Sequence, residues 1–556
     1  MADSNILTQK CTRLKGNWGA RDQKIRDWYN ILTLKDELKQ EGMESVVSND
    51  PLTGYKLGKH LMTSSVVADK IDVEKLKPEE IQSTSYLEGY VTTRWLNEER
   101  RYRKMGRQSF KGELIGLMLA TGWYAVFSMV TKDAIFSEVW NPIEVYPEFG
   151  SDGLVEVAHI YSLSATQANR KAKMMGWAIK IPFTGNVTVY DYWGFDDNGD
   201  VVNGILMGSE YVKELQVDSN LSALNNKVGQ LPIFTGPVGG LPDRGPIIGG
   251  DWQKTVGQAI VATNEELAKN YNKMLSFNQQ AARNAAQPRW FEKSTGDSPI
   301  LTEEKLNTWG AIFRGGPNDD IGPLQATPIP IELRTMMFEY GNMLQRGLFP
   351  AGIFGNVQQQ MSYLAMANIA SSALQVLTPY MDAYIGLRSD IDNFWFAMLQ
   401  VNKLKPYNFE MPKTLPESFD FEVQADIDLP GFMVQKATVA RMLDPTFKLP
   451  TRVVMDKLFP EIRNPLKAMA EARKDAAMMN PKAILVDQII AYKEQATLYQ
   501  EAGDTEAGRL YEKLAASMEA ELTTPTQPQP ARQASPIEQA MTEEVTGQPP
   551  QPGVGG

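Results

Sequence analysis

The side chains that most often perform nucleophilic or metal chemistry are nearly absent from this sequence. It holds one cysteine, Cys11, and two histidines, His60 and His159, among 556 residues. The sequence therefore holds too few Cys and His residues for disulfides or zinc sites, and it offers little basis for Cys–His pairs or Ser–His–Asp triads. The adjacent carboxylates Asp319 and Asp320 offer acid–base or metal chemistry, but they lie in a turn-rich stretch where aspartate is favoured anyway. We expect no catalytic residue, no metal site and no cofactor.

Two glycine-containing segments resemble ligand-binding loops only at first sight. Residues 231–245 are dense in glycine and proline, yet they lack the Gly-Lys-Ser/Thr of a phosphate loop and the glycine spacing of a dinucleotide fingerprint. The acidic residues 196–198 follow Gly194 and Phe195, where a calcium loop would need ligands. We interpret the first segment as an ordered linker and the second as the turn of a β-hairpin over 187–202.

Charge limits how the protein can contact nucleic acid. The 56 Lys and Arg residues against 67 Asp and Glu give a net charge of −11, which argues against general phosphate neutralisation. Any contact with DNA must then be local or transient. The uncharged loop 348–361 ends in neutral polar side chains suited to short-lived hydrogen bonds with a duplex, namely Asn356, Gln358, Gln359 and Gln360.

A second set of candidate DNA contacts is basic and lies on two predicted helices. Pairing with Glu265, Glu266 or Glu332 is at least as good an interpretation for any single member. The set comprises Lys254, Lys269, Lys273, Arg283 and Arg334.

The first 250 residues contain helices followed by a β-rich region. Helix is expected over about the first 60 residues, with a stop at Asn49–Pro51, and again over 85–120. The basic run between Arg100 and Arg107 is most simply a solvated helix face, with a nucleic-acid patch as the alternative. The uncharged stretch 114–131 predicts a buried helix that turns into a buried strand at Thr121–Gly122, rather than a membrane span. No secretory signal is apparent, and residues 123–235 alternate short β-branched and aromatic runs with turns.

Two helices bracketing a small insert follow. Asp251 is suited to cap a helix that runs to residue 287, whose second face is polar and mostly uncharged: Asn264, Asn270, Asn272, Asn278, Gln279 and Gln280. The insert covers 288–329. Pro330 and Gly347 mark the start and end of the second helix, over 331–346. Because the chain must leave and return, we expect the two helices to be antiparallel.

The remaining chain is mainly helical. Residues 362–399 predict a helix bent at Pro379, and the alternation of 418–428 predicts a strand that could rejoin the β-rich region. Residues 430–522 predict helices, and the Pro- and Gln-rich tail 523–556 is too polar to order itself. The fold class is therefore α+β.

Three stretches resemble the portal proteins of tailed bacteriophages. Residues 139–157, beginning Val-Trp-Asn-Pro-Ile, are similar to the portal wing. Residues 236–245, leading into the long helix with its Tyr-Asn-Lys-Met at 271–274, resemble the entry to the portal stem. Residues 346–364 resemble the passage from stem through tunnel loop to the long wing helix. Each string alone is weakly specific, but together they cover most of residues 20–520.

The resemblance implies a multidomain arrangement. Residues 1–250 would form an α/β wing, 251–287 and 330–347 the stem helices, and 288–329 a small α/β clip. Residues 348–361 would be the tunnel loop, 362–429 a long kinked wing helix with a returning strand, and 430–522 a helical crown. Clip residues that would meet docking partners are Trp290, Trp309, Arg314, Asp319 and Asp320.

The resemblance also implies a function and partners. The protein would form a non-enzymatic ring of twelve at the capsid vertex of a virion assembled in the host cytoplasm, without a membrane. Double-stranded DNA would pass through it. Its partners would be the large terminase subunit, a tail adaptor, the major capsid protein and scaffolding protein. Other hypotheses are a different head-completion or tail-tube protein and, less favoured, a nucleotide-dependent enzyme using residues 236–250.

Overall fold

In the part of the chain that it describes, the computed structural model combines helices with four sheets in an α+β fold. The chain divides into two compact units, Met1–Arg463 and Asn464–Gly556. It describes residues 2–39, 44–71, 77–177, 184–218, 221, 230–240, 257–286, 290–296, 299–308, 312–323, 330–349, 374–416, 419–426, 454–455, 458–459, 465–478, 480–501 and 505–523. The predicted disordered tail 523–556 lies outside these ranges except for Thr523, the last residue of helix α17.

The described residues before β2 (Trp123–Val130) form the helices α1 (Ala2–Gly16), α2 (Gly19–Leu32), α3 (Asp50–Ser64), α4 (Pro78–Lys104) and α5 (Phe110–Thr121), with strand β1 (Val66–Ile71) between α3 and α4. The prediction that Asn49–Pro51 only stops a helix was wrong. Asn49 is the N-cap of α3, and Pro51 lies in its first turn, where the missing N–H costs nothing.

The predicted change from helix to strand at Thr121–Gly122 is confirmed. Gly122 ends α5 with a φ of 67°, the left-handed conformation that glycine adopts most readily, and β2 (Trp123–Val130) begins at the next residue. Both elements are largely buried. No helix in the described part of the chain is both long and apolar enough to cross a bilayer.

The β-rich region forms two antiparallel sheets. One has the order β4-β5-β6-β7-β8, with β4 (Val145–Gly150), β5 (Gly153–Ser164), β6 (Asn186–Phe195), β7 (Val201–Met207) and β8 (Glu210–Val217). The other has the order β3-β2-β9, with β3 (Ile135–Val139) and β9 (Ile233–Pro237). The short helix η1 (Pro142–Glu144) connects β3 to β4.

The predicted hairpin turn is also confirmed. Asp196 accepts hydrogen bonds from the N–H groups of Asn198 and Asp200, at 2.9 and 2.8 Å, and Gly199 has a φ of 83°. The carboxylate is thus used to close the turn between β6 and β7.

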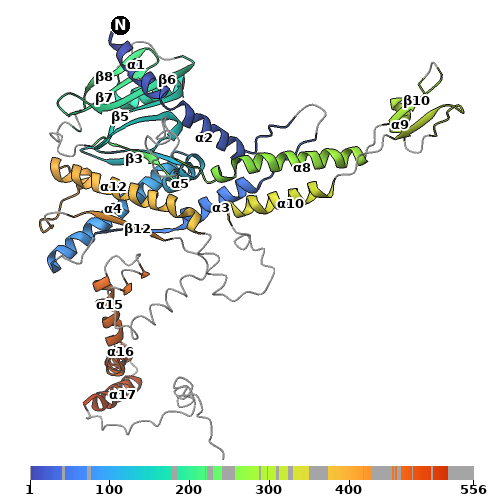
Figure 1. Cartoon of the computed structure of the whole chain (residues 1–556). Coiled ribbons are helices and arrows are strands. Elements are labelled where there is room, and N and C mark those ends of the chain that lie inside the picture. The colour runs from blue at the N-terminus through green and yellow to red at the C-terminus, as the bar shows by residue number, and fades with distance from the viewer. Residues whose placement is uncertain are drawn as a thin grey trace, which may run out of the picture. The chain divides into compact units, whose positions relative to one another are not determined.

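A helix packs on each face of the five-stranded sheet, and Figure 1 shows α1 against one of them. From α1, Leu7, Cys11 and Leu14 pack against one face, on side chains that include Tyr192 and Leu206. On the opposite face, α6 (Ala165–Met175) packs through Ala168 against Val187, Val189, Ile205 and Met207.

A long helix, α12 (Thr378–Asn402), joins the main core through Trp395 and its neighbours. It follows η6 (Gln375–Leu377) and precedes η7 (Pro406–Asn408). The bend predicted at Pro379 stays a prediction, because residues 362–373 lie outside the described residues; in the described part Pro379 lies in the first turn of α12, directly after η6. The strand predicted at 418–428 is β12 (Phe421–Asp426), but it pairs with β1 (Val66–Ile71) and does not rejoin the β-rich region.

The first bracketing helix is shorter than predicted. The α-helix α8 spans Glu265–Ala286 after a short 3-10 helix, η4 (Ala262–Asn264), and therefore does not include the described residues before 262. Residues 257–261 instead hydrogen bond to the residue after β9 and to α5: Gln258 N–H donates to the Val238 carbonyl (2.8 Å) and Ile260 N–H to the Leu119 carbonyl (2.9 Å). These contacts are distant in sequence, so the helical periodicity could not reveal them.

The second bracketing helix, α10 (Ile331–Arg346), has the predicted limits, with Pro330 and Gly347 as its caps. It runs antiparallel to α8, because Asn264 at the start of α8 donates a 3.0 Å hydrogen bond to the carbonyl of Leu344 near the end of α10. The insert between them contains β10 (Trp290–Lys293), α9 (Glu303–Asn307) and β11 (Asp320–Pro323), and β10 pairs antiparallel with β11.

The second unit is helical, as predicted. Its described elements are α15 (Pro465–Met478), α16 (Pro481–Glu501) and α17 (Thr505–Thr523). The Tyr511 ring of α17 stacks on Tyr492 and Tyr499 of α16, at centroid distances of 6.0 and 5.5 Å.

Candidate functional site

The predicted site residues fall into two groups. Six lie outside the described residues: Lys254, Trp309, Asn356, Gln358, Gln359 and Gln360. The other eight lie on α8, on α10 and in the insert, so the structure shows their surroundings. Their role in binding DNA or partners stays a prediction.

Lys269 is engaged within its own helix. Its ammonium lies 3.2 Å from Glu265 and 3.5 Å from Glu266, as the alternative interpretation of this residue proposed. Glu265 also accepts a 3.1 Å hydrogen bond from the indole of Trp28 and lies 3.3 Å from Lys24 on α2. Lys269 therefore belongs to a cluster that ties the start of α8 to α2.

The other basic candidates differ in how available they are. Arg283 pairs with Glu44 at 2.9 Å, a partner that the sequence did not suggest, and both side chains are about half exposed. Lys273 and Arg334 are exposed, and neither forms an ion pair with a described residue. Of the four described basic candidates, these two are thus the ones available to bind a phosphate group.

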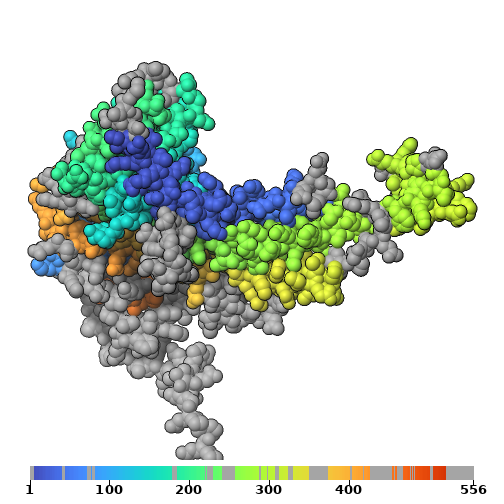
Figure 2. Space-filling model, turned by 45° about the horizontal axis from the view of Figure 1, so that its top comes forward, coloured from blue at the N-terminus to red at the C-terminus, as the bar shows by residue number. Residues whose placement is uncertain are grey.

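The antiparallel helices expose large apolar side chains. On α10, Ile331 is 74% exposed, Phe338 71% and Met343 51%, and on α8 Phe277 is 56% exposed. Ile331 and Phe338 are seven residues apart and therefore lie on the same face of α10. Figure 2 shows the two helices side by side. The sequence could have revealed these positions only if the buried face of each helix had been known.

The insert has little core of its own. None of its described residues is buried, and Trp290 and Phe291 remain 41% and 39% exposed. The Trp290 ring lies 6.0 Å from that of Phe313. Burying no apolar side chain gives this region little hydrophobic stabilisation of its own.

One carboxylate of the insert, Asp319, hydrogen bonds to the backbone of its loops. Asp319 accepts hydrogen bonds from the N–H groups of Thr295 (2.9 Å) and Gly316 (2.6 Å), and these bonds lower the pKa of its carboxyl. Arg314 and Asp320 are exposed, so they are better placed than Asp319 to meet a docking partner.

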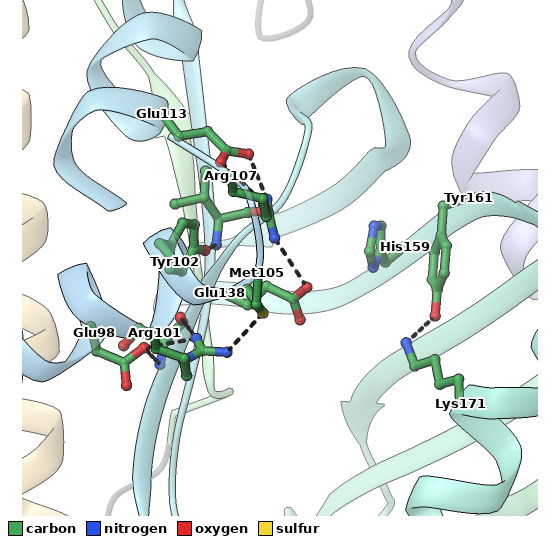
Figure 3. A network of polar contacts seen from close by, with 12 residues as sticks. Glu98, Arg101, Tyr102, Met105, Arg107, Glu113, Glu138, His159, Tyr161 and Lys171 are labelled. Atoms are coloured by element: carbon green, nitrogen blue, oxygen red, sulfur yellow. Dashed lines mark hydrogen bonds and ion pairs between the residues drawn. The ribbon is translucent and has the colours of Figure 1, made fainter. Parts of the chain in front are cut away.

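Side chains from the basic run at the end of α4 hydrogen bond to the free edge of a β-strand (Figure 3). Strand β3 lies at the edge of its sheet. Its outward N–H groups at Ser137 and Val139 donate to the Glu98 carboxylate (3.3 Å) and the Tyr102 hydroxyl (2.6 Å). The matching carbonyls accept from Arg101 and Arg107. Side chains thus cover an edge that would otherwise be open to another strand.

The two arginines of this cluster are also paired with acids. Arg101 lies 2.7 Å from Glu98, and Arg107 lies 2.5 Å from Glu113 and 3.6 Å from Glu138. These charges are used within the protein, whereas Arg100, Arg103 and Lys104 are exposed, as a solvated helix face requires.

His159 is a structural residue by its surroundings. Its ring stacks between Trp140 (3.9 Å) and Tyr161 (4.4 Å), and neither ring nitrogen has a hydrogen-bond partner among the described residues. Burial lowers the pKa of the imidazole well below its usual value, so it stays neutral. The described residues contain no cluster of three or more His, Cys, Asp or Glu side chains placed to hold a metal ion.

Comparison with known proteins gives distant structural similarities. No protein-family model matches the chain, and no curated protein matches it. The chain is similar to the neck of an empty GTA particle with C6 symmetry, at a TM-score of 0.40 and 12% identity over 74% of this chain and 90% of that chain. It is similar to the neck of a native GTA particle with C12 symmetry, at 0.38 and 11% over 74% and 89%.

A third similar structure is the virion of a native gene transfer agent particle, with a TM-score of 0.41 and 12% identity over 79% of this chain and 94% of that chain. At these TM-scores the similarities carry no weight in assigning a function.

Proposed function

We propose that this protein is the portal subunit of a tailed bacteriophage or a related particle. In this proposal, copies of the chain form a ring at the unique capsid vertex, a dodecamer by resemblance. The ring is the head-to-tail connector: a channel for genome packaging and ejection that docks first the large terminase subunit and then a tail adaptor. Its wing contacts the major capsid protein and the scaffolding protein. The ring carries no enzymatic activity.

The observation that carries the proposal is the exposed apolar surface of α8 and α10. A side chain such as Phe338, exposed by 71%, is stabilised by about 1.5–3 kcal/mol when fully buried. Large apolar patches on a surface commonly mark protein–protein contacts. A second copy of the same helix pair, standing beside the first, supplies an apolar partner for these side chains.

Two further features support the proposal. The order of parts, with helices and sheets, then two antiparallel helices around a small insert, then a helical unit, agrees with the sequence resemblance described above. The net charge of −11 is repeated in every copy, so a ring repels DNA except where basic residues are placed locally. A conduit benefits from that, because every phosphate held by a cation would slow sliding.

The test is to count subunits in the purified protein by negative-stain electron microscopy and native mass spectrometry, with two matched variants. Phe338→Asp places a charge on the proposed contact, and we expect it to abolish rings. Met174→Asp, on α6, changes an apolar side chain that is equally exposed, at 76%, and should leave rings intact. A wild-type protein that stays monomeric at high concentration would refute the proposal, and rings that survive Phe338→Asp would refute the contact assigned to α10. Helical or tubular particles would favour a tail-tube protein instead.

A further inference from the structure

The neutral polar face of α8 is occupied by another part of the same chain. Residues 44–48, which connect α2 to α3, run along the helix, and three of their N–H groups point at it. Glu44 donates to the Gln280 side chain (2.9 Å), Val46 to Ser276 (3.0 Å) and Ser48 to Asn272 (2.9 Å). The Ser276 hydroxyl also reaches back to the Val46 carbonyl at 3.4 Å. Figures 1 and 2 show this blue segment against α8.

The spacing of these contacts is regular. Every second residue of the segment meets every fourth residue of the helix, and the two run in opposite directions. Four residues of extended chain advance about 13 Å, and eight residues of helix advance about 12 Å. The two repeats therefore stay in step over three contacts, so Asn272, Ser276 and Gln280 form a ladder for an extended main chain.

The ladder binds the backbone of residues 44–48 and makes little use of their side chains. Its rungs end on backbone groups, and the one ion pair in the contact, Glu44–Arg283, is about half exposed on both sides. Exposed pairs of this kind contribute little. Beneath the segment, a cavity of about 110 Å³ lies between Val47 and Ser48, the end of α2 and α8. The packing around Val47 and Ser48 is therefore incomplete.

We propose that residues 44–48 are a strap that α8 binds mainly through the strap's main chain, with Glu44–Arg283 as a minor side-chain contact, and that this strap fixes α8 in position relative to α2 and α3. The base of α8 is held separately, by Glu265 with Trp28 and Lys24. The strap is the second attachment, about two to four turns further along the helix. Because its rungs are neutral, the attachment is insensitive to salt and to pH near neutrality. This inference concerns the single chain and does not depend on ring formation.

A pair of proline variants tests the strap. Val46→Pro removes the central N–H donor, whereas Val47→Pro removes an N–H for which the described residues provide no partner, and it leaves the preceding residue extended. Hydrogen–deuterium exchange of peptides spanning 44–49 and 272–284 is the measurement. We expect about fivefold faster exchange in the 44–49 peptide of Val46→Pro, as the loss of one hydrogen bond implies, and less than a twofold change in Val47→Pro. Equal exchange in the two variants would overturn the proposal.

The helix side provides an independent pair of variants. The triple variant Asn272→Leu, Ser276→Ala, Gln280→Leu removes every rung and should reproduce the effect of Val46→Pro. The control triple, Asn270→Leu, Asn278→Leu, Gln279→Leu, changes the neighbouring polar positions and should leave the strap protected. If removing all three rungs leaves the protection of 44–49 unchanged, something other than the ladder holds the segment.

The positioning role needs a separate readout. Spin labels at the exposed positions Arg26→Cys, on α2, and Gln279→Cys, on α8, report the distance between the two helices. Native Cys11 is fully buried and, with its thiol pKa raised to about 12 by burial, should not take a label. We expect the distance distribution to broaden in Val46→Pro and to stay narrow in Val47→Pro. An unchanged distribution in Val46→Pro would show that the strap does not position α8.

Discussion

The close contact between Gly257 and the end of α5 predicts the direction of a stability change: a methyl group added at Gly257 should destabilise the protein. Residues 257–258 pass so close to the end of α5 that a Cβ on Gly257 would lie 2.2 Å from the carbonyl oxygen of Gly122 and 2.5 Å from the indole nitrogen of Trp123. Neither neighbour can move freely. The Gly122 carbonyl accepts a 2.7 Å hydrogen bond from Val238, and Trp123 is 1% exposed.

Gly257→Ala should therefore destabilise the protein. Overpacking a rigid site costs about 1–3 kcal/mol, and here one obstacle is a backbone carbonyl, so we expect the upper half of that range. Alanine also lowers the conformational entropy of the unfolded chain, and this offsets about 0.4–1 kcal/mol of the lost stability. The expected net loss is about 1–2.6 kcal/mol in the free energy of unfolding.

The matched control makes the same chemical change where space is open. A Cβ on Gly386, within α12, meets nothing within 4 Å. Gly386→Ala should stabilise the protein by about 0.5–1 kcal/mol, because alanine is the better helix former.

Both glycines lie in the first unit, which contains all eleven tryptophans of the sequence. The urea midpoint of tryptophan fluorescence therefore compares the two variants in one transition. If Gly257→Ala matches wild type or exceeds it, the close crossing at the base of α8 is incorrect, and so is the reason given for the late start of that helix.

Two further predictions concern buried polar groups in the sheet region. Burial raises the pKa of Asp191, on β6, from 3.8 to about 6, so its ionised form costs about 3 kcal/mol above pH 6, and this cost disappears as the pH falls towards 4. Asp191→Asn should thus raise the urea midpoint at pH 7.5 and give no gain at pH 4; an equal change at both values would contradict the raised pKa. Tyr102→Phe leaves the buried N–H of Val139 without its 2.6 Å acceptor and should cost about 1–3 kcal/mol at every pH between 6 and 8. A loss below about 0.5 kcal/mol would mean that the edge of β3 does not need this hydroxyl.

Sequence patterns predicted the features whose signals lie within a few residues. The boundary at Thr121–Gly122, the turn at 196–199, and the limits of the helix between Pro330 and Gly347 all agree with the structure. Each is decided by local conformational preference, such as the left-handed φ of Gly122. The antiparallel direction of α8 and α10 also followed from the sequence, because a short insert forces the chain to return.

The candidate site was predictable only in part. The sequence correctly placed four basic candidates on two helices, but it could not say that Arg283 pairs with Glu44 and that Lys273 and Arg334 form no ion pair with a described residue. It indicated a neutral polar face on the long helix without revealing that residues 44–48 occupy it. In both cases the partner is more than 200 residues away in the chain.

Tertiary structure alone chose the partners. An alternating pattern makes 421–426 a strand, but only the packed protein assigns it to β1, because any edge of suitable register offers the same backbone hydrogen bonds. Helical periodicity extends back to residue 251, but in the described residues 257–261 the hydrogen bonds of Gln258 and Ile260 with Val238 and Leu119 replace those of a helix. Local sequence therefore determined what each segment is able to form, and the burial and hydrogen bonding available across the fold determined which of those forms it takes and what it contacts.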